Sequence, residues 1–199
     1  MIRRVALAVL VAATMLGSTG CDKLGPSGAP FKTVDVTGGG MGGEIRLTGH
    51  DGKPRSLADF KGKVVVLSFG FTHCPDVCPT TLADLAAAMK ALGQDAKSVQ
   101  VLFVTVDPKR DTQTLLSQYV PAFDPSFLGL YGDEAAVTKV TKDFHVFVQQ
   151  RAGKGADDYA VDHSAQIFVL DREGRVRLMM PPGTPPKDIA SDVKVLLNS

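Results

Sequence analysis

The chain has 199 residues, with 22 Lys and Arg against 21 Asp and Glu, and a formal net charge of +1. A nearly neutral chain lacks the basic surface that nucleic acids require, so we expect no nucleic-acid partner. Its length suits a single domain, and because it has no Trp and only 7% aromatic residues, aliphatic side chains must build most of the core.

Residues 1–20 have the layout of a bacterial secretory signal peptide. Arg3 and Arg4 come first, and an uncharged, mostly apolar run follows over residues 5–20. That run is shorter than the roughly 18–20 apolar residues that a membrane-spanning helix needs. We therefore expect cleavage after residue 20, with a retained transmembrane anchor as the alternative.

Cys21 follows the small residues Ser18, Thr19 and Gly20, as in the cleavage box of bacterial lipoproteins. The usual box has Leu three residues before the cysteine, and this chain has Ser18 there. We expect Cys21 to be lipidated and to anchor the chain to the membrane, since several acyl chains on one cysteine hold a protein stably. The alternative is an ordinary signal peptide that leaves Cys21 as an incidental thiol.

The next segment, residues 21–43, is rich in Gly, Pro, Ser and Thr and contains GGGMGG at 38–43. Such composition indicates a flexible tether that can rest on the surface of the domain. We take Met41, alone among glycines, as incidental rather than as a metal ligand. The folded domain is expected over residues 44–199.

The first half of this domain predicts two buried strands joined by a helix. A short strand, EIRLTG, leads into the turn HDGK, where His50 is expected to be solvated. The continuous β-branched runs at 63–71 and 99–107 are typical of strands covered on both faces. Between them, apolar residues recur with helical spacing over 77–92.

The second half predicts further helices and strands. Asp111 is a candidate N-cap for a helix that contains Leu115, Leu116 and Tyr119. The remaining segments are expected as a helix at 134–142, an alternating strand at 144–150, a loop at 151–160, a hairpin formed by 165–171 and 175–180, and a closing amphipathic helix at 186–199. This order describes an α/β domain with a central mixed sheet and helices on both faces, and a dithiol at the first strand–helix junction matches a thioredoxin-like fold.

Cys74 and Cys78 lie four positions apart in GFTHCPDVCPTTLA. If Cys74 opens the helix with Pro75 at its first position, the two sulfurs stand on one face with Cβ atoms about 5–6 Å apart. The helix N-terminus favours thiolates, which suit Cu(I) or Zn(II), and the same spacing also permits a disulfide. The spacing alone leaves metal binding and disulfide exchange open. Burial as small apolar side chains is the alternative, but two cysteines on one helical face, between prolines in an exported chain, argue against it.

The histidines offer candidates for a third metal ligand. His73 adjoins Cys74 but is expected to point away from it, and His145 is expected in a strand as a packed or surface side chain. His163 comes just before a buried strand, where it can face the dithiol across the edge of the sheet. A structural zinc site is disfavoured because it would need four protein ligands and the chain has no second cysteine pair.

Three strings in this order and spacing resemble the Sco/SenC family of copper-binding assembly factors for cytochrome c oxidase: GKVVVLSFGFTHCPDVCPTTLADL, VLFVTVDPKRDT and DHSAQIFVLD. The resemblance runs from about residue 43 to the C-terminus. It implies a thioredoxin-like domain that binds copper, Cu(I) or Cu(II), through Cys74, Cys78 and His163. Asp162 is then a candidate to orient the His163 ring, and Asp107 is a candidate to line the rim of the same copper site.

The resemblance leads us to expect one function, and the cysteine pair leaves a second as the alternative. The first is a copper metallochaperone on the outer, periplasmic side of the bacterial cytoplasmic membrane, delivering copper to the binuclear copper centre of cytochrome c oxidase. The second is a thiol–disulfide reductase that uses Cys74 and Cys78 to keep the cysteines of the copper-containing oxidase subunit reduced. Since the exported environment oxidises dithiols, both need a thiol reductant as partner, and the first also allows another copper carrier.

Overall fold

The computed structural model describes residues 30–155 and 158–199, so the predicted signal segment and Cys21 lie outside the described residues. An eight-stranded mixed sheet has the order β1-β10-β9-β4-β5-β6-β2-β3. Its strands are β1 (Val34–Asp35), β2 (Arg46–Gly49), β3 (Pro54–Ser56), β4 (Val64–Gly70), β5 (Val99–Thr105), β6 (Leu128–Tyr131), β9 (Ile167–Leu170) and β10 (Val176–Met180).

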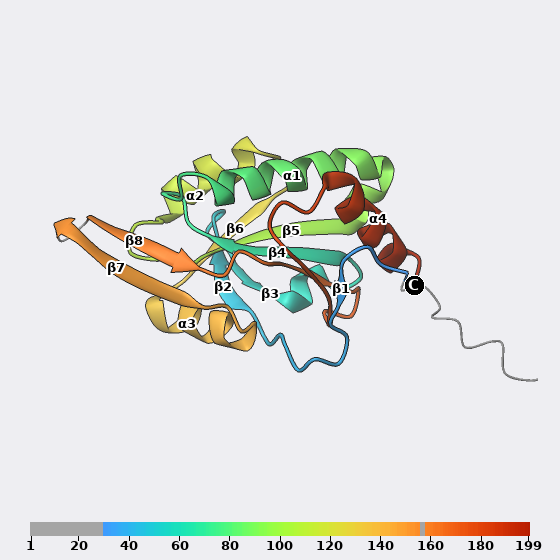
Figure 1. Ribbon diagram of the computed structural model, residues 1–199, viewed down its shortest axis with the longest axis horizontal. Coiled ribbons are helices and arrows are strands. Elements are labelled where there is room, and N and C mark those ends of the chain that lie inside the picture. The colour runs from blue at the N-terminus through green and yellow to red at the C-terminus, as the bar shows by residue number, and fades with distance from the viewer. Residues whose placement is uncertain (1–29, 156–157) are drawn as a thin grey trace, which may run out of the picture.

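The helices are α1 (Val77–Leu92), α2 (Gln113–Tyr119), α3 (Glu134–Asp143) and α4 (Pro186–Leu197), and short 3₁₀ turns cover Leu57–Phe60, Gly93–Ser98 and Val120–Ala122. A separate two-stranded hairpin consists of β7 (Val148–Gly155) and β8 (Asp158–His163). In Figure 1, α1, α2 and α4 lie on one face of the sheet and α3 on the other, and the hairpin projects from the body. The predicted mixed sheet with helices on both faces is confirmed.

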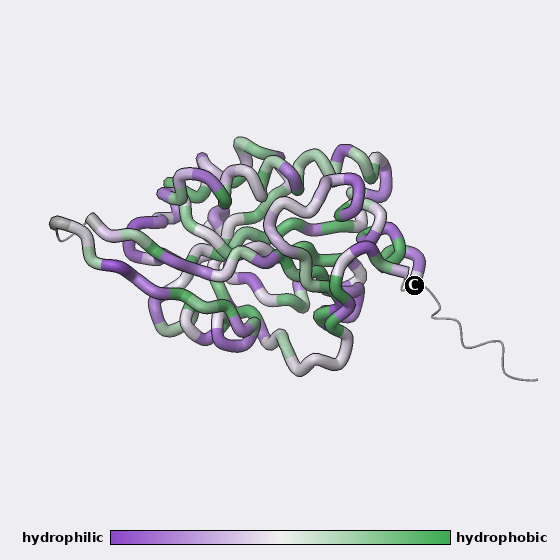
Figure 2. Tube along the Cα trace, viewed as in Figure 1, coloured by the Kyte–Doolittle hydropathy of each residue, from purple (hydrophilic) through white to green (hydrophobic). Residues whose placement is uncertain are grey.

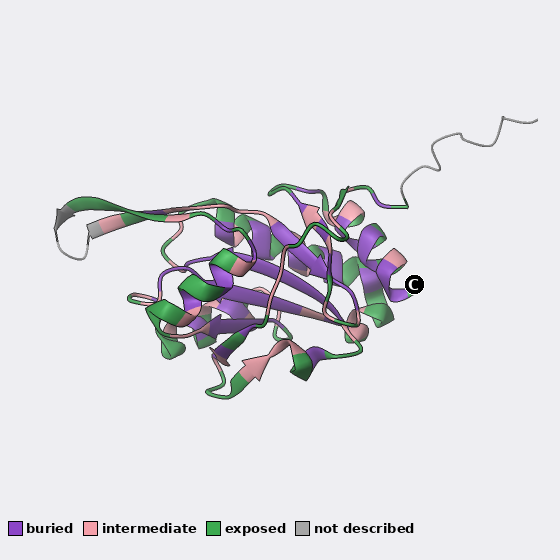
Figure 3. Cartoon of the chain, turned by 90° about the horizontal axis from the view of Figure 1, so that it is seen from below, coloured by how far each residue is buried: buried purple, intermediate pink, exposed green. Residues whose placement is uncertain are grey.

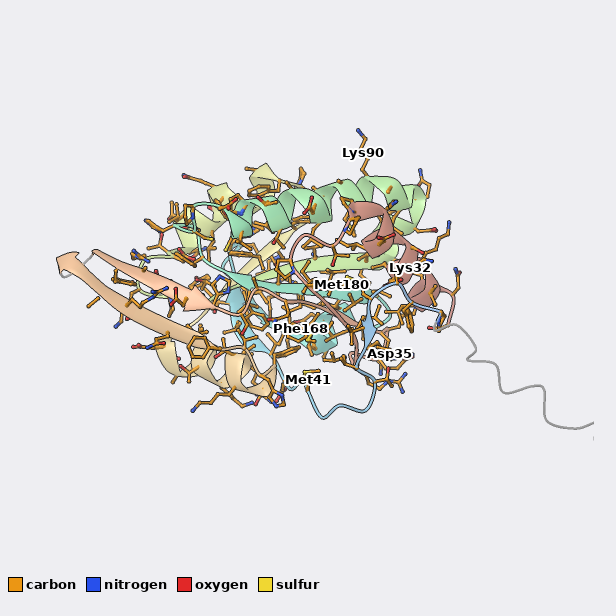
Figure 4. The ribbon with its side chains drawn as sticks, in the orientation of Figure 1. Lys32, Asp35, Met41, Lys90, Phe168 and Met180 are labelled. Atoms are coloured by element: carbon orange, nitrogen blue, oxygen red, sulfur yellow. The ribbon has the colours of Figure 1, made fainter. Side chains whose placement is uncertain are left out.

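The centre of the sheet is buried because helices cover both of its faces. β4 pairs in parallel with β5 and antiparallel with β9, and every residue of β4 is buried. Figure 2 shows the hydrophobic residues gathered in these central strands, and Figure 3 shows the same strands as the buried interior. In Figure 4, Lys90 points outward from α1, whereas Phe168 of β9 lies inside the molecule. The continuous apolar runs therefore correspond to strands buried on both faces, as predicted.

The folded part of the chain begins earlier than the expected start at residue 44. Phe31 is buried, and β1 pairs with β10 through Val34 and Met179. The buried carboxylate of Asp192 on α4 accepts hydrogen bonds from the backbone N–H groups of Lys32 (2.7 Å) and Thr33 (2.9 Å). The composition of this segment, which is typical of a tether, gave no sign of this packing. The packing depends on contacts with β10 and α4, which lie far away in the sequence.

Two predictions about residues 144–160 are wrong. The segment 144–150 is not one strand, since the chain turns at His145 (φ 54°) and β7 begins only at Val148. The apparent alternation arose because Phe144 and Val146 pack into the core after the end of α3. The expected loop at 151–160 contributes instead to both strands of the hairpin, whose polar, largely exposed sequence has no apolar pattern.

Other elements differ in detail. Thr112, not Asp111, caps α2 by accepting a hydrogen bond from the N–H of Leu115 (3.2 Å). The short strands β3 and β6 were not predicted, because three or four residues are too few to show a clear period. His50 is half-buried rather than solvated, and its Nδ1 accepts a hydrogen bond from the N–H of Gly129 (3.0 Å). Among the described residues, no helix has the length and apolar character to cross a membrane.

Candidate metal centre

The two cysteines meet at the junction of β4 and α1, but not as a helical pair. The helix begins at Val77 after the N-cap residue Asp76, so Cys74 and Pro75 precede it and the prediction that Cys74 opens the helix is wrong. The N–H of Cys74 donates to the carbonyl of Phe71 (3.2 Å), which keeps Cys74 in a turn. Its sulfur then accepts the N–H of Cys78 at 3.4 Å, in the place of a capping side chain.

His163 ends strand β8 and lies against the second cysteine. Its Nε2 is 3.6 Å from the sulfur of Cys78, and its Nδ1 is 2.9 Å from the carbonyl oxygen of Ser164. A carbonyl oxygen only accepts hydrogen bonds, so Nδ1 carries the proton and Nε2 has the free lone pair. The ring therefore turns towards Cys78 the nitrogen that a metal could bind.

The two thiols have opposite acidity. Burial opposes ionisation of Cys74, but hydrogen bonds from the Cys78 thiol and from the amides at the start of α1 outweigh it and lower the pKa of Cys74. Burial raises the pKa of Cys78 well above its ordinary value, and its hydrogen bond to Cys74 adds to the rise. Both cysteines are free, and the half-exposed Cys74 is the one that ionises first.

The electrostatics keep His163 neutral at neutral pH. Burial lowers the pKa of the His163 ring, against smaller opposing effects from the Ser164 carbonyl and the charge of Asp162. A neutral imidazole and two sulfurs form a soft donor set that suits copper. Within residues 30–155 and 158–199, no three His, Cys, Asp or Glu side chains stand close enough to hold a metal ion as they lie. Binding by all three would therefore need the donors to move closer together.

The site opens into a cleft of about 440 Å³. Cys74 and His163 lie on its wall, and Cys78 is buried behind them with 4% exposure. The other lining residues include Phe71, His73, Pro75, Val77, Arg110, Tyr159 and Asp162. His73 lines this cleft and is exposed, and its Nδ1 contacts the hydroxyl of Thr72 (3.1 Å). A partner can reach Cys74 directly, whereas Cys78 is shielded.

The structure does not give Asp162 and Asp107 the direct roles expected of them. Asp162 is bound by Arg151 (Nη2 to Oδ1, 2.5 Å), and the Ser164 carbonyl, not Asp162, holds the His163 ring. Asp107 is fully buried behind the cleft wall and bonds to Arg110 and Tyr159 rather than lining the rim. Both expectations failed for the same reason. The hydrogen-bond partners of these two carboxylates come from neighbouring strands and loops that only the folded chain brings together.

Two residues without a predicted role at the site shape the loop that carries Cys74. Gly70 ends β4 beneath Cys78, and a Cβ atom there would lie 2.9 Å from its sulfur and 2.7 Å from the Phe103 ring. Asp111, expected as a cap, is buried and accepts hydrogen bonds from the N–H (3.1 Å) and hydroxyl (2.6 Å) of Thr72. A lone glycine in a strand of bulky residues was an available signal for close approach, but nothing in the sequence pairs Asp111 with Thr72.

Comparison with known proteins gives a consistent result. The family model SCO1/SenC matches residues 35–198. The mitochondrial SCO2 homologue of Bos taurus is 40% identical over 134 residues, which is 66% of this chain and 50% of that protein. The SCO2-like protein of Rickettsia felis is 34% identical over 155 residues, which is 77% of this chain and 76% of that protein. The chain thus spans about half the length of the mammalian relative.

Solved structures share the fold. Copper-bound ScoI of Bradyrhizobium japonicum is 39% identical with a TM-score of 0.74, and the match covers 79% of this chain and 99% of that one. Copper-bound yeast Sco1 is 30% identical with a TM-score of 0.73, covering 80% and 89%. These neighbours are thioredoxin-like, as is the present fold, and they were solved with copper bound. The chain belongs to the SCO1/SenC family.

Proposed function

We propose that this protein is a copper metallochaperone that holds copper through Cys74, Cys78 and His163. The observation that carries the proposal is the 3.6 Å contact between Nε2 of His163 and the sulfur of Cys78. A disulfide exchange site needs no such nitrogen, whereas a copper site gains a third soft donor from it. The structures of copper-bound ScoI and Sco1 support the same assignment.

The three donors suit a cargo that must leave again. Two sulfurs and one nitrogen form a low-coordinate site for Cu(I), and a further ligand would let it accept Cu(II). Cys74 lies on the cleft wall, so a ligand from an acceptor protein can approach there and take the ion by exchange. We propose the binuclear copper centre of cytochrome c oxidase as the acceptor, since BsSco, whose fold this chain shares, is a member of the Sco family of cytochrome c oxidase assembly proteins.

We further propose that the protein works on the outer, periplasmic side of the bacterial cytoplasmic membrane, held there by lipid on Cys21 after removal of residues 1–20. The similar Bacillus anthracis protein, at 30% identity and a TM-score of 0.69, is a SCO1/SenC family lipoprotein. Mass spectrometry of the membrane fraction tests this directly. A diacylglyceryl adduct on Cys21 is expected, and an unmodified Cys21 in a soluble product would contradict it.

The central experiment measures copper in the reduced, purified protein. Wild type is expected to bind one equivalent of Cu(I), and His163→Ala to bind it with at least tenfold lower affinity because one of three donors is lost. His145→Ala is the matched control, since His145 lies in the turn before β7, away from the cleft lining. Equal affinity in wild type and His163→Ala would remove the histidine from the site.

The second candidate function is a thiol–disulfide reductase for the copper-containing oxidase subunit. It is favoured by the acidity difference, since Cys74 ionises first and Cys78 stays as a buried thiol that can resolve a mixed disulfide. Restoration of oxidase activity in a deletion strain separates the two. A reductase requires Cys78 but not His163, so full activity of His163→Ala alongside an inactive Cys78→Ala would favour it.

Either function implies partners for the thiols. A periplasmic thiol reductant must open any Cys74–Cys78 disulfide before metal loading, because the exported environment oxidises exposed dithiols. Another copper carrier is the expected source of the ion. Protein oxidised to the disulfide should take up no Cu(I) until a dithiol reductant is added, and full loading without reductant would argue against this requirement.

A further inference from the structure

A buried carboxylate near the cleft ties strand β8 to the body of the protein. Asp107 follows β5, is fully buried, and donates its N–H to the hydroxyl of Thr105 (3.0 Å). Its Oδ1 accepts the Tyr159 hydroxyl at 2.6 Å, and its Oδ2 accepts Nε of Arg110 at 2.5 Å. We call Asp107, Arg110 and Tyr159 the Asp107 cluster.

Arg110 makes the attachment of Tyr159 stronger. Its guanidinium carbon lies 3.8 Å from the centre of the Tyr159 ring, and its Nη1 donates to the Tyr159 carbonyl at 3.0 Å. Tyr159 is therefore held by its hydroxyl, its ring and its backbone at once. Bonds to a buried charged group are among the stronger hydrogen bonds in proteins, and removal of one partner leaves the other unsatisfied.

The attachment of Tyr159 affects His163 because Tyr159 and His163 both belong to β8. Tyr159 and His163 are four positions apart, so they face the same side of the strand, and both line the cleft. Beyond His163 the chain is fixed again, where the N–H of Ser164 donates to the carbonyl of Phe147 (3.0 Å) and the Ser164 hydroxyl accepts the N–H of Phe147 (3.1 Å). His163 thus lies between two points of attachment.

We propose that the Asp107 cluster is a positioning latch: it holds β8 so that the His163 ring stays beside Cys78, and it thereby slows the release of copper. The inference rests on the proposed copper-binding function. The hairpin projects from the body, so β8 depends on such local attachments for its place (Figure 1). With the latch open, β8 can move and take the nitrogen donor with it, while both cysteines remain on the α1 side.

The test uses Tyr159→Phe, which removes only the hydroxyl bond to Asp107 and keeps the ring over Arg110. Reduced protein loaded with one equivalent of Cu(I) is mixed with excess bicinchoninate, and the transfer rate is measured. Release from Tyr159→Phe should be about tenfold faster than from wild type. Tyr131→Phe is the matched control: its hydroxyl bonds Gln113 (3.0 Å) and neither residue lines the cleft, so the rate should equal wild type.

A double mutant separates positioning from general loosening. In the His163→Ala background, Tyr159→Phe should leave the release rate unchanged, because no ring remains to be positioned. Equal acceleration in both backgrounds, or no acceleration in the wild-type background, would overturn the latch. If His163→Ala by itself did not change the release of copper, that result would instead count against the proposed function.

A second measurement needs no copper. In the reduced copper-free protein, nuclear magnetic resonance of the imidazole nitrogens should show the Nε2 signal of His163 shifted and broadened by Tyr159→Phe, while the signal of His50 stays constant. An unchanged His163 signal would overturn the latch even if the protein proved not to carry copper.

Discussion

The Nε2 atom of His163 lies 3.6 Å from the sulfur of Cys78, although 85 positions separate the two residues. The hydrogen bond from Nδ1 to the carbonyl of Ser164 fixes which nitrogen faces the sulfur. Since a backbone carbonyl provides that bond, a change of the Ser164 side chain would not remove it. The ring therefore presents its unprotonated nitrogen to the Cys78 sulfur.

The first prediction concerns the reactivity of the two thiols. Because the pKa of Cys74 lies below its ordinary value and that of Cys78 above, the Cys74 thiolate forms at lower pH. Iodoacetamide near neutral pH should label Cys74 while Cys78 remains free, as read by peptide mass spectrometry. Cys78→Ala should slow the labelling of Cys74, since a hydrogen-bond donor to its sulfur is lost. Cys78→Ser, which keeps a donor, is the control, and preferential labelling of Cys78 would contradict the assignment.

The second prediction concerns the close packing at Gly70. Gly70→Ala would place a methyl group 2.9 Å from the Cys78 sulfur and 2.7 Å from the Phe103 ring. We expect a loss of about 1–3 kcal/mol in the free energy of unfolding and weaker Cu(I) binding, because the sulfur must shift. Urea denaturation and copper titration measure the two effects. Ser68→Ala on the same strand adds no atom and serves as control; wild-type stability and affinity in Gly70→Ala would show that the site is not tightly packed.

The third prediction concerns Asp111 beneath the cysteine loop. Its carboxylate accepts the Thr72 N–H and the hydroxyls of Thr72 and Thr105, both at 2.6 Å. Asp111→Ala would take this acceptor away from the Thr72 N–H and from the buried Thr105 hydroxyl, and we expect a loss of about 3 kcal/mol in the free energy of unfolding. Asp111→Asn keeps one acceptor oxygen and should lose less. Thermal denaturation distinguishes the variants, and equal losses would show that the acceptor oxygen kept in Asp111→Asn does not stabilise the fold.

The fourth prediction concerns pH and His50. Burial lowers the pKa of the His50 ring below its ordinary value of 6.5, so protonation favours the unfolded chain. The stabilisation is present above about pH 6.5 and is lost as pH falls through the folded-state pKa. His50→Asn can keep an acceptor for the Gly129 N–H without titrating there. Between pH 7.5 and 5.5, the melting temperature of wild type should fall further than that of His50→Asn. Parallel curves would exclude His50 as a source of the pH dependence.

Much of the fold was predictable from the sequence because it depends on local patterns. The bounds of α1 match the predicted helix at 77–92, and β4 and β5 fall within the predicted buried strands. Errors arose where local signals were weak or misleading. The hairpin β7–β8 is largely polar and exposed, so its sequence resembles that of a loop. The separate expectation that Cys74 opens the helix is wrong, because a cysteine–proline pair resembles a helical first turn although α1 begins at Val77.

For the candidate site too, some features were predictable from the sequence and others were not. The sequence alone pointed to the two cysteines at a strand–helix junction as the candidate site, and the family resemblance pointed to His163 as their distant partner. Only the tertiary structure decided which nitrogen of His163 faces Cys78 and that Cys74 lies outside the helix. It also decided that Asp107 accepts a hydrogen bond from Tyr159 and Asp111 accepts one from Thr72. The physical reason is that hydrophobic period and turn chemistry are local, whereas hydrogen bonds between buried groups depend on which segments the fold brings together.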